Sequence, residues 1–173
     1  MKKKILLVIN PESGKKKHQF YNKLIKSHLP FCEFVTFESK FKENIFDFVE
    51  ENSEYINEMD LIFIIGGDGM FHLTLNAFYE NYIDKPFMVF PAGTGNGIYK
   101  SILHSYGEEY TLKEYINLLV NDDHKLMDIM DITNGEDDLI LKSVLGISWG
   151  IISDIDMNTE WMRMIGSLRL EIG

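Results

Sequence analysis

Three short turns, each with at least one glycine, hold the residues of this chain that are best suited to chemistry. They read NPESGKKK at residues 10–17, GGDGM at 66–70 and PAGTGNG at 91–97. Glycine lets backbone N–H groups converge and lets a phosphate come close. A helix that follows such a turn adds partial positive charge at its N-terminus. Together the three turns predict a site for the polyphosphate of a nucleotide.

Standard nucleotide motifs are absent from the three turns. The first turn lacks the second glycine and the Lys-Ser/Thr pair of a Walker A loop. The other two do not complete G-x-G-x-x-G, because His72 and Ile98 stand where the third glycine belongs. Taken singly, each turn is more often a tight connection between a strand and a helix. Only their combination favours a phosphate site.

Asp68 is the carboxylate inside the second turn. A carboxylate among amides that bind phosphate is electrostatically costly unless it acts as a base or holds a cation. As a base it would take the proton of an attacking hydroxyl, and as a ligand it would hold Mg²⁺ between phosphates. A structural role is almost equally compatible with the sequence: Asp68 would then cap the helix that begins near Met70.

Apolar runs alternate with segments of helical periodicity over the first two thirds of the chain. We expect strands at Ile5–Ile9, Phe31–Phe37, Leu61–Ile65 and Phe87–Phe90. We expect helices around residues 20–25, 45–56, 71–79 and 112–119. Continuous apolar strands between helices indicate a parallel sheet that is covered on both faces. Ligands bind beyond the carboxyl ends of such strands, where the three turns lie.

The pattern changes near residue 123. Lys125–Thr133 and Leu139–Ser148 are extended runs on either side of Asn134-Gly135, a pair typical of a hairpin turn. Helical spacing returns over residues 161–172. We therefore predict an α/β nucleotide-binding domain over residues 1–122 and the beginning of a second, incomplete antiparallel β domain over residues 123–173.

Composition and charge narrow the class of protein. Cys32 is the one cysteine, so an internal disulfide is excluded and a reducing compartment is favoured. The apolar run Ile5–Ile9 is too short for a secretory signal, and no stretch approaches a membrane span, which predicts a cytoplasmic protein. The net charge of −10 argues against nucleic acid as a partner. Eight lysines within residues 1–27 would approach phosphates or an anionic membrane, or would simply be solvated.

In residue type, order and spacing, the three turns resemble the nucleotide-site motifs of the diacylglycerol kinase catalytic domain, a lipid-kinase family that includes sphingosine and ceramide kinases. The segment SWGIISDIDMNTEWMRMIGSLR at 148–169 is similar to the entry of sphingosine kinases into their second domain. The resemblance covers the whole chain but about half of such an enzyme. It implies a diacylglycerol kinase and phosphofructokinase-like fold. It also implies ATP and Mg²⁺ as cofactors, with transfer of the γ-phosphoryl group to the primary hydroxyl of sphingosine or a related sphingoid base.

The resemblance also implies a role for each matching residue. Asp68 would be the general base and a candidate ligand of Mg²⁺. Asp154 would recognise the ammonium and hydroxyl of the lipid, and Asp156 is grouped with it as a substrate-binding candidate, with a structural role as the alternative. The residues that would hold ATP are Asn10, Ser13, Gly14, Gly66, Gly67, Gly69, Gly93, Thr94, Gly95, Asn96, Arg163 and Arg169. A lipid substrate further implies peripheral contact with a membrane.

Three residues near the second turn depart from the family pattern. Met70 stands where threonine or leucine is usual, Leu73 replaces a common glutamate and Ala77 a common glycine. Other readings of the chain therefore stay open. They are a diacylglycerol or ceramide kinase, a nucleotide-binding fragment without complete catalytic machinery, and a different α/β enzyme that binds nucleotides.

Overall fold

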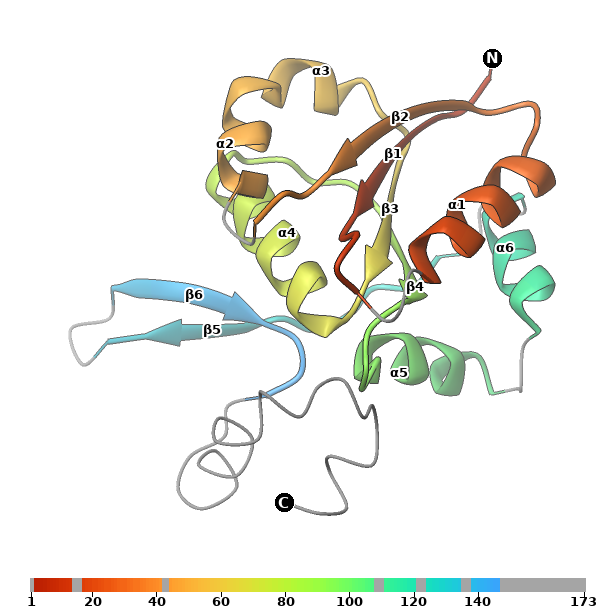
Figure 1. Ribbon diagram of the computed structural model, residues 1–173. Helices are drawn as coiled ribbons and strands as arrows, with labels where there is room; N and C mark the ends of the chain where they lie inside the picture. Colours follow the sequence, from red (N-terminus) through yellow and green to blue (C-terminus); the bar gives the residue numbers. More distant parts are fainter. Residues whose placement is uncertain are drawn as a thin grey trace.

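A four-stranded parallel sheet lies at the centre of the chain (Figure 1). The computed structural model describes residues 2–13, 17–41, 44–107, 111–120, 124–134 and 138–146. The strands are β1 (Lys4–Ile9), β2 (Glu33–Glu38), β3 (Leu61–Gly66) and β4 (Phe87–Pro91), in the order β2-β1-β3-β4. The predicted α/β class and parallel sheet are confirmed, with boundaries that shift by no more than a few residues.

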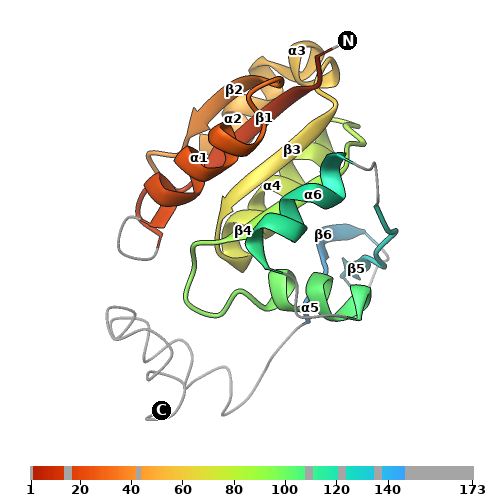
Figure 2. The ribbon, with the colours of Figure 1, turned by 90° about the vertical axis from the view of Figure 1, so that its right-hand side faces the viewer.

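Helices cover both faces of this sheet. They are α1 (Lys17–His28), α2 (Asn44–Glu51), α3 (Ser53–Asn57), α4 (Asp68–Glu80), α5 (Gly97–Tyr106) and α6 (Leu112–Val120). α1 and α6 lie on one face, as Figure 2 shows, while α2, α3 and α4 pack on the other. Connections between parallel strands are right-handed, so the direction of the step along the sheet decides which face the helix covers. α1 connects β1 to β2 in one direction, whereas α2, α3 and α4 connect β2 to β3 and β3 to β4 in the other.

The two hydrophobic clusters of the core are built from alternate residues of the same strands. In β1, Leu6 and Val8 join the cluster under α2 and α4, while Leu7 and Ile9 join the cluster under α1 and α6. β3 alternates in the same way. All six residues of β3 are buried because both faces of the sheet are covered. This explains why the sequence of β3 is an unbroken apolar run.

The strand order reverses between β1 and β3, and this reversal decides where the glycine turns meet. β1 connects to β2 on one side, while β3 and β4 follow on the other side. The connections that leave β1 and β3 therefore diverge to opposite faces of the sheet. Such a switch point opens a crevice at the carboxyl ends of the strands, where nucleotides bind in open α/β sheets. The turns after Ile9 and Gly66 flank this point.

A second, two-stranded sheet follows α6 in the chain. β5 (Met130–Thr133) pairs antiparallel with β6 (Leu139–Ser143), and Figure 1 shows this ribbon below α4. The Asn134 N–H donates to the Asp138 carbonyl at 3.0 Å, so the chain reverses where the hairpin was predicted. Both strands are shorter than the extended runs seen in the sequence. The domain boundary at residue 122 remains a prediction.

Three helical features differ from the sequence-based expectation. The single helix expected over 45–56 is two helices, α2 and α3, separated at Asn52, whose side-chain amide donates to the Phe48 carbonyl at 2.8 Å. α4 begins at Asp68 rather than near Met70. α5 was not predicted; it runs from Gly97 to Tyr106 and is followed by Gly107, a left-handed residue with φ 81°.

None of the helices in the described ranges has both the length and the apolar character that crossing a membrane requires.

Tyr115 closes the open edge of the sheet at β4. Its hydroxyl accepts from the Val89 N–H at 3.2 Å and donates to the Val89 carbonyl at 3.0 Å, in place of a further strand. Burial raises the pKa of Tyr115, so the hydroxyl stays protonated and able to donate. A capping box fixes the start of α6, since the Glu114 carboxylate accepts from the Thr111 N–H at 2.8 Å. α6 thereby holds Tyr115 against the edge strand.

Replacing Tyr115 by phenylalanine is expected to lower the free energy of unfolding by about 1–3 kcal/mol, because two buried backbone groups of Val89 lose their partner. Denaturant unfolding measures the change. Tyr99→Phe is the matched control: the Tyr99 ring packs edge-on against Tyr115, but its hydroxyl makes no hydrogen bond within the described ranges. An equal loss in both variants would show that Val89 does not depend on the Tyr115 hydroxyl.

Candidate nucleotide site

The three glycine turns meet at the carboxyl edge of the sheet. The Asn10 N–H donates to the Ile65 carbonyl at 3.0 Å, which ties the first turn to the end of β3. The Ala92 N–H donates to the Gly66 carbonyl at 3.0 Å, which ties the third turn to the second. The turns are therefore continuous with the sheet and hydrogen-bonded to one another, as a shared site for one ligand requires.

The second and third turns touch backbone to backbone at Gly67 and Gly93. A Cβ on Gly67 would lie 3.0 Å from the Gly93 Cα, and a Cβ on Gly93 would lie closer still to the Gly67 Cα. At each position the nearest atom is backbone, which cannot move aside as a flexible side chain could. Both positions therefore require glycine because of close packing, and neither has a positive φ.

Gly66 is restricted by its own helix. A Cβ there would lie 2.8 Å from the Met70 Cβ, so the first turn of α4 packs directly on the end of β3. Met70 is buried in the core, which explains why a large apolar residue is accommodated at this position. Gly69 differs from these glycines, because an added Cβ would meet nothing within 4 Å and the residue is exposed.

The first turn is shaped by Asn10. Its side-chain oxygen accepts from the Glu12 N–H at 3.0 Å, and its carbonyl accepts from the Ser13 N–H at 3.2 Å. An asparagine side chain that bonds to the backbone two residues later stabilises a turn, because it takes the place of a backbone hydrogen bond. Asn10 and Ser13 therefore lie at this edge in a defined loop, while α1 begins a few residues later.

The third turn is closed by Asn96. Its side chain accepts from the Gly93 N–H and donates to the Gly93 carbonyl, both at 2.8 Å. Asn96 itself is left-handed, with φ 55°, a conformation that asparagine tolerates better than most residues. Thr94 and Gly95 lie at the tip of this closed loop and are exposed. Their backbone groups are therefore accessible to a ligand.

Asp68 joins the second turn to the helix that follows the third. Its carboxylate accepts from the Gly97 N–H and from the Ile98 N–H, both at 2.9 Å. These donors are the first two residues of α5, whose own N-cap residue makes no side-chain cap. The expectation that Asp68 caps its own helix is wrong. Asp68 is the first residue of α4, and its side chain caps α5 instead.

Tyr21 connects α1 to the same edge. Its hydroxyl donates to the Pro91 carbonyl over a long distance of 3.5 Å, and its ring packs on Phe90. Burial raises the pKa of Tyr21, which keeps this donor neutral. α1 is thus held beside the start of the third turn.

The structure brings most of the predicted site residues together. Those that lie in the three turns at one edge are Asn10, Ser13, Gly66, Gly67, Asp68, Gly69, Gly93, Thr94, Gly95 and Asn96. Gly14, Asp154, Asp156, Arg163 and Arg169 lie outside the described residues. Sequence reasoning did not find Asn76, a buried polar residue in the middle of α4. An asparagine inside an otherwise apolar helix was the available signal, because asparagine is a poor interior helix former.

The chemistry of this edge suits a phosphate ligand with a divalent cation. Exposed backbone at Thr94 and Gly95 and open space beside Gly69 leave room for a phosphate. In the described ranges, no three His, Cys, Asp or Glu side chains lie together as a metal site would need. Mg²⁺ commonly binds through one or two carboxylates and the phosphates of the substrate, so Asp68 alone fits that donor set.

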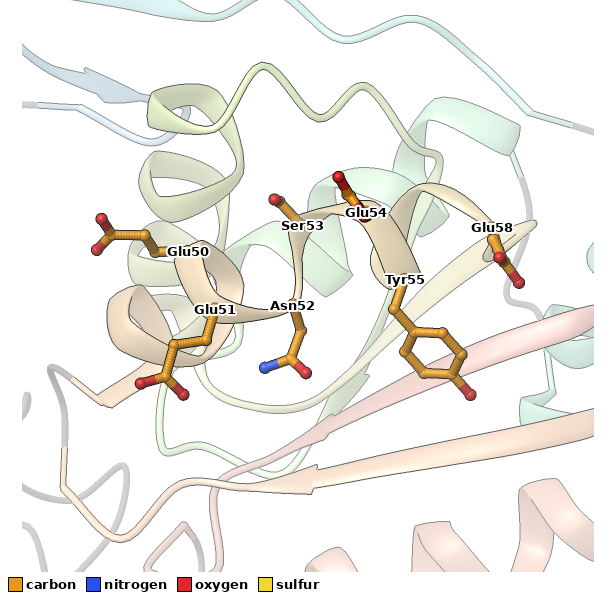
Figure 3. Close-up of a pocket in the computed structure, with 7 residues that line it drawn as sticks. All are labelled: Glu50, Glu51, Asn52, Ser53, Glu54, Tyr55 and Glu58. Atoms are coloured by element: carbon orange, nitrogen blue, oxygen red, sulfur yellow. The ribbon is translucent and has the colours of Figure 1, made fainter.

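A separate pocket of about 510 Å³ lies along α2 and α3 (Figure 3). Its lining includes Glu50, Glu51, Glu54 and Glu58, which Figure 3 shows fanned out along the helices. A hydrogen bond from Lys4 lowers the pKa of Glu58, so this carboxylate is ionised and paired. Carboxylates repel phosphate, and no residue of the three turns lines this pocket. It therefore adds nothing to the nucleotide site.

A family model of the diacylglycerol kinase catalytic domain matches residues 4–132. Sphingosine kinase 1 of Homo sapiens is 29% identical, with 98% of this chain and 47% of the relative covered. Sphingosine kinase 1 of Mus musculus and sphingosine kinase 2 of Arabidopsis thaliana are each 28% identical over 98% of this chain, which covers 47% and 36% of them. The chain spans less than half the length of these relatives.

Solved structures with a similar fold include diacylglycerol kinases of Bacillus anthracis. One crystal structure has a TM-score of 0.50 and 20% sequence identity, and the match covers 75% of this chain and 44% of that chain. A putative diacylglycerol kinase from the same organism has a TM-score of 0.51 at the same identity and coverage. At this level of identity the likeness concerns the fold alone.

Gly93→Ala is expected to destabilise the fold by about 1–3 kcal/mol, because the added methyl group overlaps the backbone of Gly67 and pushes the two turns apart. Gly69→Ala is the matched control in the adjacent turn. Its methyl group enters open space within α4, so stability should be unchanged or raised by up to about 1 kcal/mol. Denaturant unfolding of both variants checks the prediction. Equal stability of Gly93→Ala and the parent chain would contradict the close contact.

Proposed function

Because the chain belongs to the diacylglycerol kinase catalytic-domain family, we propose that it transfers the γ-phosphoryl group of ATP to the primary hydroxyl of a lipid, namely sphingosine or a related sphingoid base. The observation that carries this proposal is the position of Asp68. Its carboxylate lies where three glycine-bearing turns converge at the end of a parallel sheet. A base and a phosphate cradle at one edge are the two parts that phosphoryl transfer to an alcohol needs.

In the proposed reaction Asp68 receives the proton of the attacking hydroxyl. Each carboxylate oxygen has two lone-pair sites and uses one for an N–H of α5, so one remains on each oxygen. The hydroxyl oxygen forms a bond to the γ-phosphorus, the bond from that phosphorus to the β,γ-bridging oxygen breaks, and ADP leaves with the electron pair. The hydrogen bonds from Gly97 and Ile98 keep the carboxylate from rotating while this happens.

The glycine turns would hold the phosphates of ATP. Gly67 and Gly93 place no Cβ atoms at this edge, and the backbone of Thr94 and Gly95 at the tip of the third turn is exposed to a phosphate. Asn10, Ser13, Thr94 and the other turn residues would complete this cradle, with Arg163 and Arg169 as candidate guanidinium contacts. Bound Mg²⁺ would supply positive charge that neutralises the transferring phosphoryl group, with Asp68 as a candidate ligand.

Two observations favour a sphingoid base as the lipid. Several relatives at 25–32% identity are named sphingosine kinases. The second is the resemblance of the segment 148–169 to sphingosine kinases, which implies that Asp154 would pair with the ammonium of the substrate, with Asp156 two residues later. An ammonium that enters an apolar slot needs a paired anion, because burial of an unpaired charge is costly. Diacylglycerol and ceramide carry no such ammonium and remain the alternative substrates.

A second candidate function is nucleotide binding without transfer. The observation that favours it is the capping role of Asp68, because a carboxylate that holds the start of α5 has a structural reason to be present. Leu73, which packs against the core where the family commonly has a glutamate, also favours it.

For the lipid kinase, the substrate lies in a lipid bilayer, so we propose that the chain makes peripheral membrane contact when it acts.

Asp68→Asn is expected to reduce transfer from ATP to sphingosine by about 10²–10⁴-fold, because the amide cannot accept the proton of the hydroxyl. Labelled-phosphate transfer with Mg²⁺ and a panel of sphingosine, ceramide and diacylglycerol measures it. The amide still accepts one of the two α5 hydrogen bonds, so the fold should persist.

Asp60→Asn is the matched control for Asp68→Asn. Its carboxylate also accepts a backbone N–H, from Lys4 at 2.7 Å, but at the opposite end of the sheet. The control should keep full transfer. Unchanged turnover in Asp68→Asn would reject the role of a base. Nucleotide binding by folded protein, without transfer to any of the lipids, would favour the second candidate function.

Asp154→Ala is expected to lower kcat/KM for sphingosine by about 10- to 100-fold, as loss of a charge-assisted hydrogen bond predicts, with little change in the KM for ATP. Asp128→Ala is the control, because it removes an exposed carboxylate that lies shortly before β5. It should change neither kcat/KM for sphingosine nor the KM for ATP. Steady-state kinetics with each substrate varied in turn provides the measurement. An equal loss for sphingosine and ATP would count against recognition of the amine.

A further inference from the structure

We infer that Asn76 is a positioning residue for Asp68, and that it acts through β6 and the start of α5. This inference rests on the proposed function for its catalytic meaning, but the coupling that it describes is a property of the fold. Asn76 lies on the same helix as Asp68, eight residues later, which places it about 12 Å along α4. It is one of the few buried polar residues in the described ranges.

The side chain of Asn76 is bonded to the backbone of β6 as a neighbouring strand would be. Its Oδ1 accepts from the Lys142 N–H at 2.8 Å, and its Nδ2 donates to the Lys142 carbonyl at 3.0 Å. Nδ2 also donates to the His72 carbonyl at 2.8 Å, within α4. One amide thereby joins the middle of α4 to the middle of a strand 66 residues away.

Lys142 strengthens this junction with its side chain. Its ammonium lies 4.0 Å from the centre of the Tyr79 ring, on α4, and pairs with the carboxylate of Asp131 on β5. The two strands of the hairpin are therefore both held to α4 around Lys142. The Asp131 carboxylate of this ion pair is exposed, so water screens the pair and weakens its contribution. The Asn76 hydrogen bonds are partly buried and lack that screening. We therefore assign most of the attachment to Asn76.

From this junction β6 leads directly to the site. Val144 packs against the core cluster that contains α4. Leu145 follows, and its Cδ2 lies 3.4 Å from the point where a Cβ on Gly97 would be. Gly97 and Ile98 are the residues whose N–H groups hold the carboxylate of Asp68. Leu145 thus lies beside the first residue of α5, at the end of the hairpin.

These contacts form a closed loop of packed elements. α4 begins with Asp68, which bonds to α5; α5 is contacted by Leu145; and the strand that precedes Leu145 is bonded to Asn76 on α4. If Asn76 loses its hydrogen bonds, the N–H and the carbonyl of Lys142 lose their partners, and β6 is no longer held to α4. Leu145 then no longer restrains the start of α5. The orientation of the Asp68 carboxylate should become less defined.

The decisive experiment measures amide hydrogen exchange in the full chain, so that it does not require turnover. Asn76→Leu removes the hydrogen bonds at similar size, and we expect exchange at Lys142, Gly97 and Ile98 to rise about tenfold or more, relative to Leu7 in β1. Asn81→Leu is the matched control at the residue that follows α4, because the Asn81 side chain also donates to a carbonyl of α4, that of Ala77, but contacts no residue of β6 by a hydrogen bond within the described ranges. It should leave all three amides unchanged.

Two outcomes would overturn the proposal. Faster exchange at Lys142 alone would mean that Asn76 holds the hairpin without any effect on α5. An equal rise at Leu7 would mean that the substitution merely lowers global stability. Leu145→Ala, at a half-exposed residue, tests the last contact: we expect faster exchange at Gly97 and Ile98 with Lys142 unchanged, and no change at Gly97 would reject this route.

Transfer kinetics add a readout of catalytic positioning. In Asn76→Leu, kcat for the lipid should fall about tenfold or more while the KM for ATP stays constant, because the side chain of Asn76 bonds to His72 and Lys142 and to none of the cradle residues Asn10, Thr94 and Gly95. A rise in the KM for ATP with unchanged kcat would contradict positioning of Asp68. If the parent chain shows no transfer, the proposed function fails, whereas the exchange data still decide whether Asn76 controls α5.

Discussion

The close contact between the backbones of Gly67 and Gly93 is the constraint on which the rest of this edge depends. Neighbouring strands of a sheet lie about 4.8 Å apart, so the turns that leave β3 and β4 begin close together. Here neither turn has a side chain at the contact. Asp68, the next residue, can therefore reach across and bond to the first residues of α5. A methyl group at Gly93 would push the two turns apart. It would also move the Asp68 carboxylate away from the N–H groups of Gly97 and Ile98.

The Asp68 carboxylate combines a structural and a chemical role. The N-terminus of α5 has unpaired N–H groups and partial positive charge, and Asp68 satisfies both. The same interaction fixes the direction of a carboxylate beside a phosphate cradle, which is how enzymes preorganise a base. α4 then acts as a rigid link: its first residue faces the turns, and its middle is bonded to β6 through Asn76. The hairpin is thus part of the support of the site.

Local sequence determined most of the fold. Unbroken apolar runs such as Leu61–Ile65 predicted strands with two covered faces, and the glycine turns predicted where a ligand would meet the sheet. The helix over 97–106 was missed because it begins inside a turn that was read only for its glycines. The sequence did not predict the break at Asn52, because α2 and α3 both place apolar residues on the same face. The helical periodicity therefore continues across the break.

The sequence by itself determined the class of fold, the three turns and Asp68 as the carboxylate among them, because these depend on residue type and on neighbours close in the chain. Only the tertiary structure decided what Asp68 contacts, why Gly67 and Gly93 exclude side chains, and that Asn76 is bonded to β6. Those partners lie 26 to 66 residues apart, and no local pattern records a distance between segments that meet only after the sheet has formed.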